Sequence, residues 1–244
     1  MKSFFLLTSI LSLFFSLSCF GKIVLIDPGH GGEEIGAVGY LDSAREKKVF
    51  EKDLSLRLAL KVKELLNRST TAYLTRSLDR AVTLQERADL ADIVKADLFL
   101  SIHFNSSTNP SSHGFELYYL DNNSDVAARK VEKAENLNLK GEELIINQIL
   151  VDLVIQKTVE HSKQLASMVH SSVSPYVRTH GITDRGVKSG LFYVLALSKR
   201  PGLLVEAGFV SNPKELKKIG EEKYLDDIAK GISDGVLKFI RNQK

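Results

Sequence analysis

Short apolar runs rich in β-branched residues alternate with amphipathic segments along most of the chain. This alternation constrains the fold more than any other feature, because strands separated by helices pair in parallel and need helices on both faces of the sheet. We expect strands at 22–27, 72–75, 97–102, 114–120, 191–196 and 202–206, and helices at 51–67, 83–95 and 222–241. The sequence therefore predicts an α/β fold with a mostly parallel twisted sheet flanked by helices.

The region from about 122 to 177 interrupts this alternation, since it contains no run typical of a strand. Apolar residues at helical spacing predict a long amphipathic helix over 142–160, after a loop at 138–141. A chain of 244 residues suits one domain with an insertion. We interpret residues 22–244 as one catalytic domain in which about 122–177 form a helical insertion.

The first 21 residues have the pattern of an export signal. Lys2 precedes an apolar run that extends to about Phe20, which is short for a membrane span. A buried N-terminal helix is the alternative. Cys19 follows Ser16-Leu17-Ser18, which is similar to a weak lipidation signal. The leucine that such signals favour three positions before the cysteine is missing, because position 16 is serine. We expect an exported, periplasmic protein, and a lipid anchor at Cys19 stays an open alternative to simple cleavage.

Composition argues against a nucleic-acid-binding protein and against sites that need several cysteines. The 33 Lys and Arg residues are interleaved with 30 Asp and Glu residues, and the net charge is only +3, so we expect no nucleic-acid partner. A single cysteine excludes an intrachain disulfide and a metal site made of several cysteines.

Histidine and glutamate residues lie at the ends of three predicted strands. His30 follows the first strand, His103 follows the strand at 97–102, Glu206 ends the last strand, and Glu51 begins the first helix. Carboxyl ends of parallel strands and the starts of the helices that follow them meet at one edge of a sheet. Two imidazoles and one carboxylate with an open position are typical of catalytic zinc, and a second carboxylate can accept a proton from the activated water. A structural, hydrogen-bonded histidine is the alternative at either position.

Other chemistries have weaker motifs. The glycine-rich turn at 29–32 completes no nucleotide-binding motif, and G-x-S-x-G is absent. Short elements at 107–109, 188–190 and 211–214 are similar to those of penicillin-sensitive serine carboxypeptidases, in a different order. In that secondary alternative, Ser211 is the nucleophile and Lys214 activates it.

Seven motifs, in order, resemble the zinc-dependent N-acetylmuramoyl-L-alanine amidases of the cell-division type (amidase type 3). They lie at 27–32 (DPGHGG), 36–39, 51–59, 74–79, 84–91, 96–105 and 203–213. The resemblance covers nearly all of the chain after residue 21. It implies a hydrolase that cleaves, in peptidoglycan, the amide between N-acetylmuramic acid and L-alanine.

The same resemblance assigns roles to residues. It implies that His30, Glu51 and His103 bind Zn²⁺ and that Glu206 is the catalytic carboxylate. For the reaction we also expect Asn105 to orient substrate or support a ligand and Arg76 to pair with an acidic group. A role as a structural hydrogen bonder is the alternative for both residues. The presence of all four principal residues argues against a non-catalytic wall-binding module, the alternative from another class.

Relatives controlled by the division machinery carry a helical insert that plugs the active site, which implies a divisome-associated activator. The pairs Glu135-Asn136 and His161-Ser162, with Val151-Asp152-Leu153, are similar to parts of such inserts. On this resemblance Glu142 and Glu143 are the candidate carboxylates that reach zinc and inhibit the enzyme. A solvated helix on the sheet is the alternative.

Overall fold

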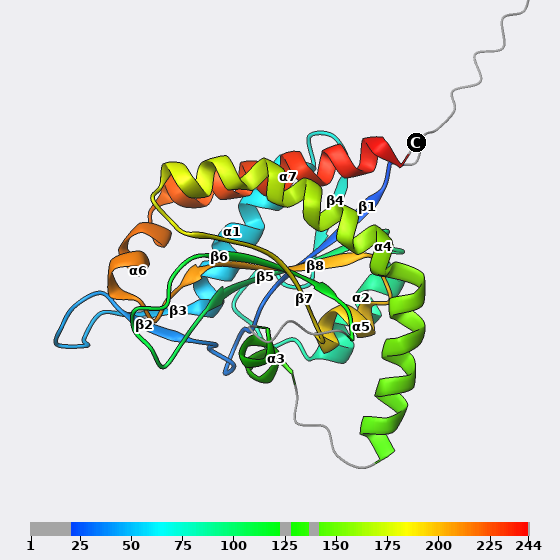
Figure 1. Cartoon of the computed structure of the whole chain (residues 1–244), viewed down its shortest axis with the longest axis horizontal. Helices are drawn as coiled ribbons and strands as arrows, with labels where there is room; N and C mark the ends of the chain where they lie inside the picture. The colour runs from blue at the N-terminus through cyan, green and yellow to red at the C-terminus, as the bar shows by residue number, and fades with distance from the viewer. Residues whose placement is uncertain (1–20, 123–127, 137–141, 244) are drawn as a thin grey trace, which may run out of the picture.

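A six-stranded sheet forms the centre of the computed structural model, which describes residues 21–122, 128–136 and 142–243, with the main chain alone at 142–148 (Figure 1). The spatial order of its strands is β4 (Thr71–Leu74), β1 (Ile23–Pro28), β5 (Leu98–Asn105), β8 (Gly202–Phe209), β6 (Phe115–Leu120) and β7 (Asp184–Gly190). All neighbouring strands are parallel except β6 and β8, which are antiparallel. The predicted α/β fold with a mostly parallel sheet is confirmed.

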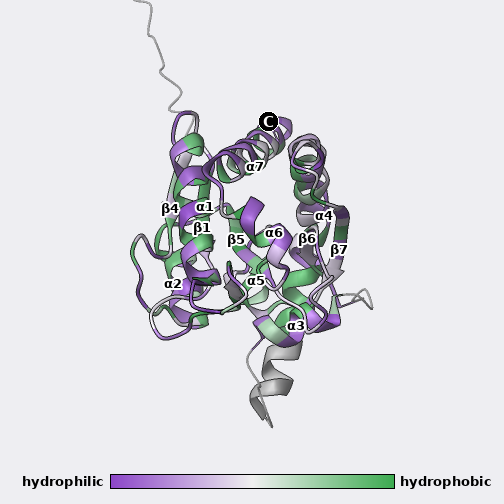
Figure 2. Ribbon diagram, turned by 90° about the vertical axis from the view of Figure 1, so that its left-hand side faces the viewer, coloured by the Kyte–Doolittle hydropathy of each residue, from purple (hydrophilic) through white to green (hydrophobic). Residues whose placement is uncertain are grey.

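Helices cover both faces of this sheet (Figures 1 and 2). The first face packs against α1 (Glu51–Leu66), α7 (Glu222–Asn242) and the C-terminal part of α4 (Glu142–Thr179). The second face packs against α2 (Leu84–Ile93), α5 (Tyr193–Ser198), α3 (Arg129–Glu135) and earlier residues of α4. Side chains of β1 point alternately to the two faces of the sheet. Val24 and Ile26 pack into the core on the first face, and Leu25 packs into the core on the second face.

Two short elements flank the edge of the sheet where the predicted site residues lie. The hairpin of β2 (Val38–Tyr40) and β3 (Lys48–Phe50) leads directly into α1, and α6 (Pro213–Ile219) follows β8. The sequence predicts neither hairpin strand, since three residues are too few to show a period of two.

The strand predicted at 191–196 is wrong, because helix α5 occupies most of this run. Val194, Leu195 and Ala196 are all buried, so the run is apolar on every side and carries no period that separates a strand from a helix. The strand β7 was missed for the opposite reason. It is a half-exposed edge strand of mostly polar residues.

The helices of the predicted insertion connect two strands of the sheet. Because β6 and β7 are parallel neighbours, α3 and α4 form the crossover that connects them. The helix predicted at 142–160 continues to Thr179, and the loop predicted at 138–141 lies outside the described residues. Nearly all of the predicted export signal, Cys19 included, also lies outside them. In the part of the chain that is described, no helix is long and apolar enough to span a membrane.

Glycines of α7 bring this helix into close contact with α4. A Cβ atom on Gly235 would lie 2.4 Å from Cα of Val169, and one on Gly231 would lie 2.7 Å from Cα of Val173. Two main chains can approach this closely only where one of them carries no side chain. The packing of α4 on α7 therefore depends on these glycines.

We expect Gly235→Ala to lower the free energy of unfolding by about 1–3 kcal/mol, because its methyl group must push α4 and α7 apart. Lys238→Ala, at an exposed position of the same helix, is the control and should stay within about 0.5 kcal/mol of the wild type. Urea unfolding followed by circular dichroism measures both variants. Equal stability of the two variants would contradict the close crossing.

Candidate metal centre and active site

The turn after β1 holds His30 in a strained conformation. Its φ is +58°, a left-handed value that residues other than glycine rarely adopt. Two buried arginines hold the turn. The Arg87 guanidinium donates to the carbonyl oxygen of His30 (3.0 Å), and that of Arg76 donates to the carbonyl oxygen of Gly29 (2.8 Å). Their hydrogen bonds stabilise a main-chain path that points the His30 side chain toward the edge of the sheet.

Arg76 therefore has a different partner from the one expected. Among the described residues, its hydrogen bonds end on main-chain carbonyl oxygens, including those of Pro28 and Lys52. The side chain is only 1% exposed, so it cannot pair with an acidic group of a substrate from solution. Of the two roles expected for Arg76, these contacts favour the structural hydrogen bonder, because Arg76 supports the turn.

His30, Glu51 and His103 meet at the predicted edge. They come from the turn after β1, from the first residue of α1 and from the middle of β5. Oε1 of Glu51 lies 3.2 Å from Nε2 of His30 and 3.0 Å from Nδ1 of His103, and the two imidazole rings are 5.0 Å apart. Three separate elements thus direct one nitrogen or oxygen each toward a common point.

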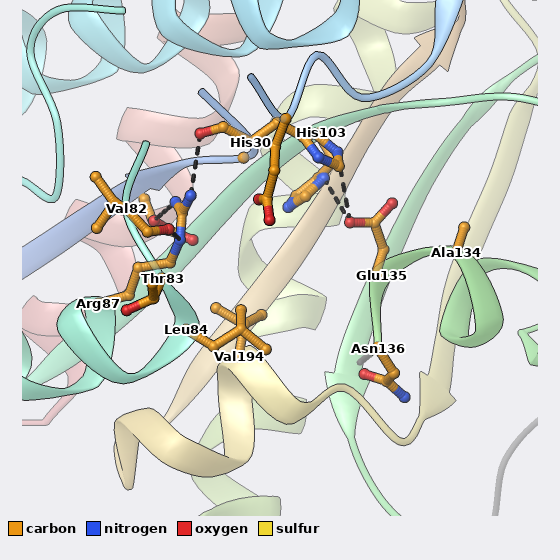
Figure 3. Close-up of a pocket in the computed structure, with 13 residues that line it drawn as sticks. His30, Val82, Thr83, Leu84, Arg87, His103, Ala134, Glu135, Asn136 and Val194 are labelled. Carbon is orange, nitrogen blue, oxygen red and sulfur yellow. Dashed lines mark hydrogen bonds and ion pairs between the residues drawn. The ribbon is translucent and has the colours of Figure 1, made fainter. Parts of the chain in front are cut away.

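Glu135, the last residue of α3, is the fourth member of this cluster. Its Oε2 lies 3.0 Å from Nδ1 of His103 and 3.6 Å from Nε2 of His30, and Figure 3 shows both imidazoles directed toward it. No pattern in the sequence predicts this role for Glu135, although Glu135-Asn136 is similar to part of a regulatory insert. The expected residues Glu142 and Glu143 begin α4, and their side chains lie outside the described residues.

Contacts on either side of Glu135 fix the end of α3. The Glu132 carboxylate accepts from the main-chain N–H of Leu191 (2.7 Å), and the Asn136 amide donates to the carbonyl oxygen of the same residue (2.6 Å). The Asn136 side chain also accepts from the N–H of Tyr193 (2.9 Å). The segment that leads into α5 therefore holds Glu135 in the cluster.

The donor atoms of the cluster fit a divalent metal ion. Two imidazole nitrogens and two carboxylate oxygens lie within 4.8 Å of one another. Nε2 of His30 is buried and makes no hydrogen bond with any described residue, although Glu51 is near it. A buried nitrogen without a hydrogen bond is costly, and a metal ion would satisfy it. Imidazole and carboxylate are ligands that zinc accepts.

The pKa values show an excess of negative charge. Burial disfavours the charged form of both groups, yet His30 and His103 hold the pKa of Glu51 below its ordinary value. Burial likewise lowers the pKa of His103, but Glu135 and Glu51 outweigh it and raise that pKa well above its ordinary value. The cluster therefore favours a positive charge at its centre.

A buried hydrogen-bond chain orients His103. Oγ of Ser101 lies 3.2 Å from Nε2 of His103 and donates to Oδ2 of Asp27 (2.9 Å). Asp27 also accepts from Thr75 (2.6 Å) and pairs with Arg87, which outweighs burial and lowers its pKa. Because Nε2 of His103 contacts Ser101, Nδ1 faces the cluster.

Glu206 lies beside this cluster on β8, where it is the register partner of His103 on β5. Its side chain is buried, and its Oε2 makes no hydrogen bond with any described residue. Burial and the charge of Glu135 raise the pKa of Glu206 well above its ordinary value. A carboxylate with a raised pKa and a free oxygen is suited to proton transfer.

The remaining predicted residues lie on the hairpin side of the cluster. Asn105 and Glu51 line a cavity of about 380 Å³. Ser211 and Lys214 line a neighbouring groove, in the turn before α6 and at its start. Oγ of Ser211 accepts from the N–H of Ser107 (2.9 Å), and a main-chain amide donor cannot take the proton of a hydroxyl group. This contact does not activate Ser211 as a nucleophile.

The sequence profile of a family described as N-acetylmuramoyl-L-alanine amidase matches residues 24–238. The chain belongs to this family. The match includes His30, His103 and the glutamates at 51, 135 and 206.

Individual amidases are similar to the chain over most of its length. The N-acetylmuramoyl-L-alanine amidase AmiA of Escherichia coli (strain K12) is 32% identical over 236 residues, which cover 91% of this chain and 78% of AmiA. The catalytic domain of CwlV, from Bacillus (Paenibacillus) polymyxa var. colistinus, is 31% identical with a TM-score of 0.68, covering 90% of this chain and 98% of that domain. An amidase structure from Clostridium difficile 630 is 29% identical with a TM-score of 0.69, covering 92% of this chain and all of that one. These likenesses extend the family assignment to the whole described fold.

Proposed function

We propose that this protein is a zinc-dependent hydrolase of the amide between N-acetylmuramic acid and L-alanine in peptidoglycan. The observation that carries the proposal is the convergence of His30, Glu51 and His103 on one point, with the buried Glu206 on the adjacent strand. Membership of the amidase family supports the same reaction. Because peptidoglycan lies outside the cytoplasmic membrane, the proposal also supports export through residues 1–21.

His30, Glu51 and His103 would hold the metal and leave one position for substrate or water. A zinc ion there would supply a Lewis acid for the scissile carbonyl and for water, and its charge would offset the repulsion among the carboxylates. Glu206 accepts the proton of the attacking water through its free oxygen. It then transfers this proton to the departing nitrogen of L-alanine.

We expect Glu206→Gln to retain zinc and to lose about 10²–10⁴-fold in kcat, because the amide isostere cannot accept the proton. Chelation of the wild type should abolish release of the stem peptide from purified walls, and zinc should restore it. His103→Ala is the contrasting variant, since it should lose the metal itself. Near-normal turnover of Glu206→Gln, or full activity of metal-free protein, would contradict the proposal.

The chain from His103 through Ser101 to Asp27 would set the metal affinity, because it fixes the orientation of an imidazole ligand. We expect Ser101→Ala to raise the Kd for zinc by about 10–100-fold, as measured by competition with a chelator. Ser55→Ala is the matched control, since the Ser55 hydroxyl is equally buried and makes no hydrogen bond with a described residue. Equal zinc affinity of the two variants would refute the role of Ser101.

We also propose that Glu135 inhibits the enzyme. Its carboxylate takes the fourth place in the cluster beside His30, Glu51 and His103, and α3 lines the cavities on both sides of it. Removal of α3 from the cluster is then the step that a divisome-associated activator would promote. This role, expected from the sequence for Glu142 and Glu143, is better supported for Glu135.

We expect Glu135→Ala to raise kcat/KM by roughly 5–150-fold without loss of zinc, because the open position becomes available to substrate. Lys133→Ala, an exposed position of the same short helix, is the control and should leave kcat/KM unchanged. A Glu135→Ala variant that is no faster than the wild type, with its zinc retained, would show that Glu135 does not inhibit.

A further inference from the structure

A second hollow adjoins the metal cluster between the β2–β3 hairpin and α6. This hairpin groove has a volume of about 650 Å³, and its lining includes Tyr40, Arg45, Ser107, Ser211, Lys214 and Lys217. Ser106 lines both this groove and the cavity of about 380 Å³ that contains His30 and Glu51. A bound chain that leaves the cluster past Asn105 and Ser106 therefore enters the hairpin groove.

Positive charge predominates in the groove. Arg45, Lys214 and Lys217 are exposed, and the Arg45 guanidinium lies 5.0 Å from the centre of the Tyr40 ring, which holds it at the wall. The one acidic residue of the lining is Asp42. It is already engaged, since it accepts hydrogen bonds from the main-chain N–H groups of Glu46 and Lys47 (2.9 and 2.8 Å).

The cavity on the other side of α3 has a different character. It measures about 270 Å³, and its lining combines the apolar side chains of Val82, Leu84 and Val194 with acidic residues that include Glu34 and Glu135 (Figure 3). Its cation, Arg87, is buried and paired with Asp27, so that charge is not available to a ligand. The two sides of the metal cluster thus differ in charge.

We propose that the hairpin groove binds the carboxylates of the stem peptide, and so sets the direction in which substrate crosses the metal cluster. The inference rests on the proposed function. A stem peptide carries carboxylates at its acidic residue and at its C-terminus, whereas the muramic acid on the other side of the scissile amide has no free carboxylate. The peptide then extends toward α6, and the glycan lies toward Val82 and Val194.

The test compares two soluble muramoyl peptides that differ only in their stem carboxylates, which are free in one and amidated in the other. We expect Lys214→Glu/Lys217→Glu to raise KM for the free-carboxylate substrate about 10-fold, with kcat within about twofold of the wild type, because opposed charges are replaced by like charges. The KM for the amidated substrate should stay unchanged. Lys223→Glu/Lys238→Glu, two exposed positions of α7 with the same total change of charge, is the control.

A rise in KM that is equal for both substrates, or equal in the control variant, would overturn the groove as the carboxylate site. Failure of the proposed reaction is separable, because it would appear as no cleavage of either substrate by the zinc-loaded wild type. In that event calorimetry with the free stem tetrapeptide decides the inference. The wild type should bind the tetrapeptide at least about 10-fold more tightly than Lys214→Glu/Lys217→Glu does, and equal affinity would refute the proposal.

Discussion

The buried ion pair between Asp27 and Arg87 is the interaction on which the candidate site depends. Asp27 is the last residue but one of β1, and its two oxygens connect this strand to Thr75 after β4 and to Ser101 on β5. Arg87 extends the same network from α2 to the carbonyl oxygen of His30. Loss of either partner would leave a buried charge without compensation, which costs far more than an exposed pair does. One ion pair therefore holds both imidazoles in place, His30 through its main chain and His103 through Ser101.

The crossover between β6 and β7 contributes to the core and also carries Glu135, the residue that we propose as the inhibitor. Its long helix α4 packs against the sheet and α7 and so belongs to the core. Its short helix α3 makes few buried contacts, since Val131 is its one buried residue. A segment with little buried apolar surface opens at a lower free energy than the core does. In the inhibition that we propose, α3 would therefore leave the cluster at a lower cost in free energy than α4.

Charge is distributed unevenly around the cluster. This distribution bears on the binding of both a metal ion and a charged substrate. The carboxylates of Glu51, Glu135 and Glu206 favour a cation at the centre. The free cations of the hairpin and of α6 lie on one side only, where they can interact with an anionic chain. A substrate with charge at one end can bind such a site in one direction.

The sequence alone determined the fold class and the positions of His30, Glu51, His103 and Glu206 at one edge of the sheet. It could do so because the carboxyl ends of parallel strands lie at one edge of a sheet, whatever the spatial order of the strands. Tertiary structure alone decided the rest. Glu135 is held in the cluster by the contacts of the end of α3 with Leu191 and Tyr193, and α5 is a helix in a run whose pattern does not distinguish a helix from a strand. The hairpin groove likewise joins residues near 40, 107 and 214. Contacts between segments so far apart in the chain leave no periodic pattern in the sequence, because they depend on which surfaces the folded elements present to one another.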